Sequence, residues 1–81
     1  MVKVMDEAGK KALCDRLARV EGQLRGLQKL IQAEAESEKV AQQMTAARKA
    51  LDKAFFALVA TLIAEGQVDS DEVAALLLRF A

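Results

Sequence analysis

Apolar residues recur along the first half of the chain at alternating spacings of four and three. That spacing places them on one side of an α-helix, because 3.6 residues complete each turn. The polar and charged residues between them fall on the other sides. The pattern therefore predicts an amphipathic helix that begins near Lys10. The stripe consists of Leu13, Leu17, Val20, Leu24, Leu27 and Ile31.

The same spacing returns in the middle of the chain, which is organised around the stretch Thr45–Ala64. From Ala54 to Ala64 no residue is charged, so the apolar face widens until it nearly surrounds the helix. We predict one helix over Glu38–Ala64, roughly 40 Å long at about 1.5 Å per residue. Its stripe consists of Val40, Met44, Ala47, Leu51, Ala54 and Leu58.

The helix ends are predicted from capping residues. Ser37 is the expected N-cap of the long helix, although helix propensity alone would also allow an unbroken helix through this acidic stretch. Gly66 is the expected residue just beyond its end. Asp69, with Glu72 three residues later, resembles a capping box for a third helix over Ser70–Phe80. That helix is too short to be stable alone and should dock on the second.

Composition agrees with an all-α chain of one domain. The 81 residues include no Pro and only four Gly, and 53% are hydrophobic. We predict a flexible N-terminal arm over residues 1–9 and a single helical domain over residues 10–81. So small a chain cannot cover the long apolar helix on every side. Self-association of the three-helix subunit is therefore expected.

Charge is balanced overall but unevenly distributed. Residues 1–53 hold eleven basic and eight acidic side chains, whereas residues 54–81 hold Arg79 against four acids. Basic groups held along a rigid surface can bind nucleic-acid phosphates, although solvated helix faces also carry such residues. The candidate DNA-binding residues are Lys10, Lys11, Arg16 and Arg19 on the first helix, and Arg48, Lys49 and Lys53 on the second.

Other chemistry finds little support in the composition. The chain has no His and a single Cys, so we predict neither an enzyme nor a transition-metal site, and no cofactor. Cys14 fits the role of a small apolar residue at the flank of the first helix. To act as a thiol sensor, it would need a lowered pKa. One Cys fits a reducing cytoplasm, and the uncharged stretch of 11 residues is too short to span a membrane.

Two segments resemble a known family. They are RLARVEGQLRGLQKLI (Arg16–Ile31) and QQMTAARKALDKA (Gln42–Ala54). They are similar to the RL-x-R-[IV]-x-GQ-x-x-G core and the QI-[ST]-A-V-R-x-AL-type segment of the CsoR/RcnR/FrmR group. That group consists of bacterial transcriptional repressors that respond to metals or aldehydes. The resemblance runs from about Leu13 to Arg79.

The resemblance implies an antiparallel four-helix-bundle dimer, assembled as a dimer of dimers into a homotetramer. It implies binding of double-stranded operator DNA through basic residues of the first two helices, without a helix-turn-helix. Arg16 and Lys53 fall at basic contact positions of the family, and Arg48 is the arginine of the second motif.

The sequence departs from the family at the sensing site. The family's Cys at the start of the second helix aligns with Ser37, and its His and second Cys align with Leu62 and Gly66. These three residues cannot form a copper, nickel, cobalt or zinc site. Ser37 also removes the thiol nucleophile used to sense aldehydes.

Three hypotheses follow from the sequence. The first is a DNA-binding repressor of this type with a degenerate metal- and thiol-sensing site. The second is a helical oligomerisation module, or hetero-oligomer partner of a family member, that does not bind DNA. The third, ranked below both, is a redox sensor based on Cys14.

Overall fold

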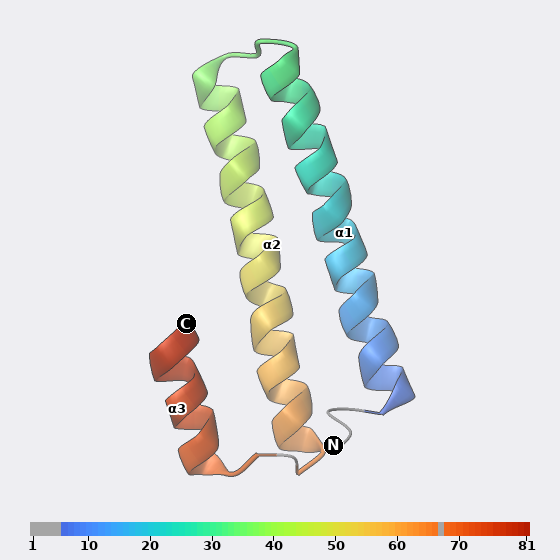
Figure 1. Cartoon of the computed structure of the whole chain (residues 1–81), viewed down its shortest axis with the longest axis vertical. Helices are drawn as coiled ribbons and strands as arrows, with labels where there is room; N and C mark the ends of the chain where they lie inside the picture. Colours follow the sequence, from blue (N-terminus) through green and yellow to red (C-terminus); the bar gives the residue numbers. More distant parts are fainter. Residues whose placement is uncertain (1–5, 67) are drawn as a thin grey trace.

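Two long antiparallel helices form the body of the molecule, and a short third helix lies beside the second. The computed structural model describes residues 6–66 and 68–81. In chain order the helices are α1 (Glu7–Gln32), α2 (Ser37–Ala64) and α3 (Ser70–Phe80). Figure 1 shows α2 lying between α1 and α3, with α3 running back along the C-terminal half of α2. The all-α, three-helix prediction is therefore confirmed for the described residues.

The contact between α1 and α2 sets valine and leucine side chains of α1 against alanine side chains of α2. Val20 and Leu27 of α1 are buried, as are Ala47 and Ala54 of α2, and Ala54 is only 2% exposed. These residues belong to the two stripes predicted from the sequence. The two helices can approach closely because an alanine adds only a methyl group to the helix surface.

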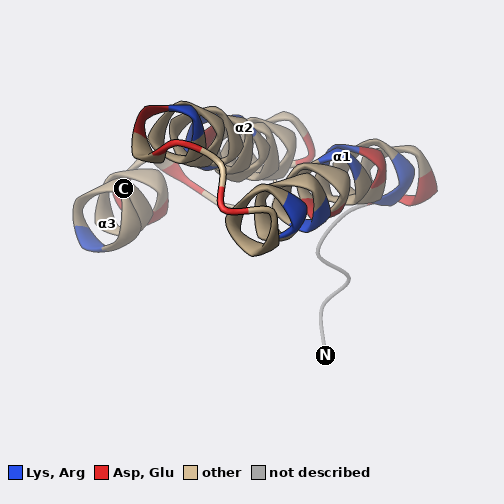
Figure 2. Ribbon diagram, turned by 90° about the horizontal axis from the view of Figure 1, so that it is seen from above, with Lys and Arg blue, Asp and Glu red and all other residues tan. Residues whose placement is uncertain are grey.

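The molecule is thin and elongated. Its dimensions are 47 × 27 × 18 Å and its radius of gyration is 15.9 Å, whereas a compact chain of this length would have about 11.7 Å. Viewed from above in Figure 2, the helices lie next to one another and no further layer covers them. Many large apolar side chains consequently remain exposed.

The first helix begins earlier than predicted. The side chain of Asp6 caps it by accepting a hydrogen bond from the Gly9 amide at 2.7 Å. Residues 7–9 are thus helical, and the predicted boundary at residue 10 is corrected. The rest of the predicted arm, residues 1–5, lies outside the described residues. The amide of Asp6 also donates to Glu65 Oε1 at 2.6 Å, which joins the start of α1 to the end of α2.

The turn between α1 and α2 has the geometry of a Schellman motif. The Ala35 amide donates to the Leu30 carbonyl and the Glu34 amide to the Ile31 carbonyl. Glu34 occupies the left-handed position with φ of 58°. Glu36 is then extended and becomes the N-cap of α2, without a side-chain capping bond. Ser37 is therefore the first helical residue of α2, and its predicted role as N-cap is wrong by one position.

The other two predicted helix signals are confirmed. Gly66 follows α2 with φ of 68°, in the same left-handed position that Glu34 occupies after α1. Asp69 caps α3 by accepting a hydrogen bond from the Glu72 amide at 2.9 Å. α3 begins and ends at the predicted residues.

Replacing Glu34 by glycine and Gly66 by alanine should change the free energy of unfolding in opposite directions. Glu34→Gly should raise the free energy of unfolding by about 0.5 kcal/mol, because glycine has no Cβ to strain at positive φ. Gly66→Ala should lower it by about 1 kcal/mol, and no neighbouring atom lies within 4 Å of an added Cβ, so the loss comes from the backbone alone.

Urea unfolding at a fixed subunit concentration measures both changes. Glu34→Ala is the matched control, since it removes the charge of Glu34 but keeps a Cβ. A Glu34→Gly variant no more stable than Glu34→Ala would contradict the strain at this position.

Candidate nucleic-acid interface

Three of the predicted DNA-binding residues lie along one groove between α1 and α2. Arg16 and Arg19 reach it from α1 and Lys53 from α2, and all three side chains are exposed. Spacings of three and four residues place Arg16, Arg19 and Gln23 on the same side of α1. We call the set Arg16, Arg19, Gln23, Ala50 and Lys53 the basic groove.

The local fold explains why these residues come together. α1 and α2 run antiparallel, so a residue early in α1 lies beside a residue late in α2 (Figure 1). Ala50 lies between the longer side chains, and its methyl group leaves room for the positive groups on either side. Helical backbones hold all of them, which fixes the spacing of the points from which the charged side chains extend.

The cations of the basic groove are not neutralised by neighbours. Within residues 6–66 and 68–81, none of Arg16, Arg19 and Lys53 forms an ion pair with a carboxylate. Like charges that share one groove repel one another, and an anion placed between them removes that repulsion. The groove is therefore suited to an anionic group with several oxygen acceptors.

The other predicted residues are placed differently. Lys10 pairs with Glu7 at 3.3 Å and Lys11 with Asp15 at 3.1 Å, both on the exposed surface of α1. Lys49 is exposed one helical turn before Lys53. Arg48 does not reach the basic groove and instead lines a second groove on another face of the helix pair.

Gln23 is the polar residue of the basic groove that was not predicted from the sequence. Its side chain carries no charge, but an amide group can donate hydrogen bonds to a phosphate. A signal was present, because Gln23 is the glutamine of the GQ pair in the first motif.

The second groove is mostly apolar. Leu24 of α1 and Met44 and Leu51 of α2 line it, together with Val20, Ala47 and Arg48. Leu17 and Ile31 lie seven residues on either side of Leu24 and therefore extend this face along α1. We call the exposed set the apolar stripe: Leu17, Leu24, Ile31, Met44 and Leu51.

The basic groove and the apolar stripe lie on opposite flanks of the α1–α2 contact. Four residues turn a helix by about 400°, or about 40° beyond a full turn. Arg16, four residues before the buried Val20, is therefore displaced to one side, and Leu24, four residues after it, to the other. A partner that covers the apolar stripe would leave the basic groove open.

The three residues that the motif resemblance aligns with the family's ligands do not fit a transition-metal site. Among the described residues no group of three or more His, Cys, Asp and Glu side chains is placed to hold a metal ion. Ser37 begins α2 and offers a hydroxyl, Leu62 is a half-buried apolar residue, and Gly66 offers no side chain. Cys14 lies alone on the exposed surface of α1.

Comparison with known protein families identifies the chain. A family model described as a metal-sensitive transcriptional repressor matches residues 9–77. The protein is thus a small all-helical transcriptional repressor by family. The particular family is the one to which CsoR and RcnR belong, and the resemblance stated from the two motifs is confirmed. It is a family of regulators and not of enzymes, and it implies DNA binding and oligomerisation in general.

Two further comparisons gave no match, either with curated proteins or with solved structures. None of the described helices has the length and apolar character needed to cross a membrane.

The apolar stripe should be required for self-association. Leu24 is 46% exposed and Leu51 is 51% exposed in the single chain, so changing them removes little packing within the subunit. Leu24→Gln should weaken association at least tenfold in sedimentation equilibrium, because it places an amide where apolar contact is expected. Leucine and glutamine have similar helix propensities, so α1 itself should persist.

Leu78→Gln is the matched control, since Leu78 is 88% exposed and lies on α3, away from the stripe. Equal loss of association in both variants would count against a specific role for the stripe.

Proposed function

We propose that the protein is a homo-oligomeric, DNA-binding transcriptional repressor of the CsoR/RcnR type with a degenerate metal- and thiol-sensing site. The observation that carries the proposal is that Arg16, Arg19 and Lys53 line one groove without ion-pair partners among the described residues, in a chain that belongs to a repressor family. A protein that acts on the genome in this way belongs in the bacterial cytoplasm.

The chemistry of the basic groove suits the DNA backbone. Arginine presents a planar set of donors that can hold two oxygens of one phosphate, and lysine supplies a compact charge. Gln23 adds neutral donors beside them. Neutralising phosphates releases counterions condensed on the duplex, which gives affinity that depends strongly on salt. Such contacts fix the position of the protein on DNA and do not read sequence directly.

Self-association would repeat the basic groove along a longer surface. The exposed surface of the subunit is 6328 Å², whereas a compact monomer of this mass would have about 4,800 Å². The excess is comparable with the area that a subunit buries in one or two stable interfaces, at about 800 Å² each. We infer an antiparallel dimer through the apolar stripe, and a tetramer made of two such dimers.

The dimer also explains how the family positions of the sensing site could meet. Ser37 and Leu62 are 25 residues apart in α2, which corresponds to about 38 Å along one helix. A single subunit cannot bring them together, but two antiparallel α2 helices can place Ser37 of one copy near Leu62 of the other. In this protein that junction would hold a hydroxyl and an isobutyl group, and its effector would act by shifting helix packing.

DNA binding should depend on the basic groove. With a duplex from the protein's own promoter region, Arg16→Gln and Lys53→Gln should each lower affinity about tenfold at low salt. Each should also reduce the slope of log affinity against log salt by about one unit for every subunit groove engaged. Fluorescence anisotropy over a salt series measures both quantities.

Arg25→Gln provides the matched control. Arg25 is exposed like Arg16, but nine residues turn a helix by about 900°, which places it on the opposite side of α1. Its substitution should change affinity by less than about twofold. An unaltered affinity in the Arg16 and Lys53 variants, or no salt-sensitive binding by the parent protein, would overturn the proposal and favour an oligomerisation module.

The loss of metal sensing can be tested by loading and dialysis. The parent protein should retain no stoichiometric copper(I), nickel or zinc in elemental analysis, because it lacks the imidazole and thiolate ligands these ions prefer. Ser37→Cys/Leu62→His should retain copper(I), since two ligands suffice for that ion and the two residues would meet across the dimer.

Tight metal binding by the parent protein would show that its sensing site is intact in another form. Absence of copper from the double variant would contradict the antiparallel pairing of α2 helices.

A further inference from the structure

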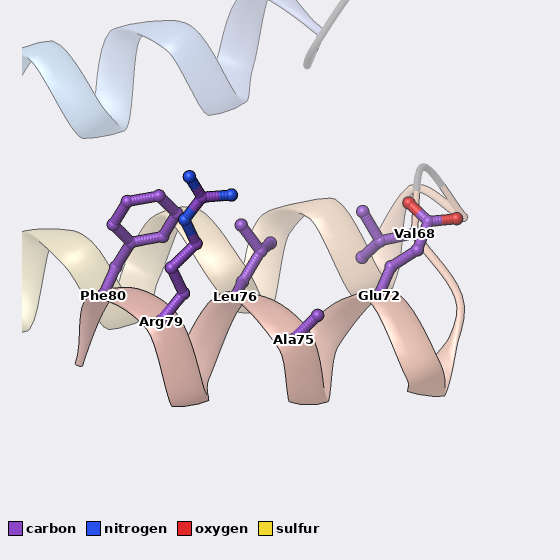
Figure 3. A pocket seen from close by; sticks show the side chains of 6 residues that line it. All are labelled: Val68, Glu72, Ala75, Leu76, Arg79 and Phe80. Carbon is purple, nitrogen blue, oxygen red and sulfur yellow. The ribbon is translucent and has the colours of Figure 1, made fainter.

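One face of α3 forms a shallow apolar groove with opposite charges toward its two ends. Glu72 lies toward the start of the helix and Arg79 toward its end, as Figure 3 shows. Residues seven apart return to the same side of a helix after about two turns. The remaining lining residues are Val68, Ala75, Leu76 and Phe80.

The groove on this face is lined by α3 residues and Val68 alone, although Phe80 also lines another groove with Phe55 and Phe56 of α2. α3 buries none of its residues completely, and both Glu72 and Arg79 are exposed. Neither forms an ion pair within the described residues. Seven residues separate them by about 10 Å along the axis, which is too far for mutual pairing. The Arg79 guanidinium lies 5.3 Å from the centroid of the Phe80 ring, a contact that favours its position at this end.

We propose that this face docks against α3 of a second copy of the chain in antiparallel orientation. Turning a helix end for end reverses its order of charges, so Glu72 of each copy would meet Arg79 of the other. The two-fold axis would pass between Ala75 and Leu76, which places the small side chain of one copy against the larger one of its mate. Such an isologous contact is complementary to itself.

The order of charges along α3 favours antiparallel over parallel pairing with a second copy. A parallel arrangement would set Glu72 against Glu72 and Arg79 against Arg79, which repel. An antiparallel one forms two opposite-charge pairs flanking an apolar centre. The inference rests on the proposed self-association and names the residues of its second interface. Two different two-fold interfaces, one through the apolar stripe and one through α3, close into a tetramer when their axes are perpendicular and intersect.

Charge exchange tests the pairing. Glu72→Arg and Arg79→Glu should each convert tetramers into dimers, with association weakened about tenfold, because each reversal turns two attractive pairs into repulsive ones. The combined variant Glu72→Arg/Arg79→Glu should recover parental association within about threefold, since the pairs re-form with exchanged signs. Sedimentation equilibrium at low salt measures the tetramer–dimer constant.

Asp71→Arg is the matched control. It makes the same charge change in the first turn of α3, but about 100° around the helix from Glu72, and should leave association within threefold of the parent. Weakening in Asp71→Arg equal to that in Glu72→Arg, or no recovery in the combined variant, would overturn the inference. The combined variant also lacks the acidic residue that stabilises the first turn of α3. Recovery of its association therefore cannot be explained by a more stable α3.

The test is independent of DNA binding. A parent protein that binds no duplex, yet dissociates on Glu72→Arg and recovers in the combined variant, would refute the proposed function and support this pairing. A tetramer that binds DNA and keeps its association constant in all three variants would support the proposed function and refute this pairing.

Discussion

The close contact of α1 with α2 is the constraint on which the rest of the structure depends. It is made by Val20 and Leu27 against Ala47 and Ala54, and these residues, with Val59, are the buried apolar side chains among those described. So few side chains release little free energy on burial compared with the conformational entropy lost by some seventy ordered residues. The contact therefore sets the geometry of the subunit but does not by itself account for its stability. The proposed self-association would supply the rest, by burying surface that a single chain leaves exposed.

That contact also divides the helix pair into two flanks with different chemistry. One flank gathers Arg16, Arg19 and Lys53, and the other exposes leucine, isoleucine and methionine side chains. Separation of this kind lets one surface serve association while the other stays available to an anion. A net charge of zero is therefore no obstacle to binding a polyanion, because the relevant quantity is the local arrangement of unpaired cations.

Much of this architecture could be predicted from the sequence, for identifiable reasons. The alternating four–three spacing fixed the helical faces, and Gly66 and Asp69 marked ends whose capping chemistry is local. The start of α2 was misplaced by one residue because Glu34 adopts a left-handed conformation that side-chain propensity disfavours. Arg48 and Lys53 are five residues apart in α2 and so lie about 140° apart around the helix, but the placement of α1 was needed to show that Lys53 shares a groove with Arg16 and Arg19. Gln23 was overlooked because a neutral amide gains its significance from the cations beside it.

The hydrogen bond from the Asp6 amide to Glu65 closes the molecule at the end opposite the α1–α2 turn. The carboxylate belongs to the C-cap residue of α2, at the start of the segment that leads to α3. Fraying of the first turn of α1 and loosening of the α2–α3 corner should thus be one cooperative event, because both break the same bond. Amide hydrogen exchange at these two places, far apart in the chain, would then share a single opening rate and opening free energy.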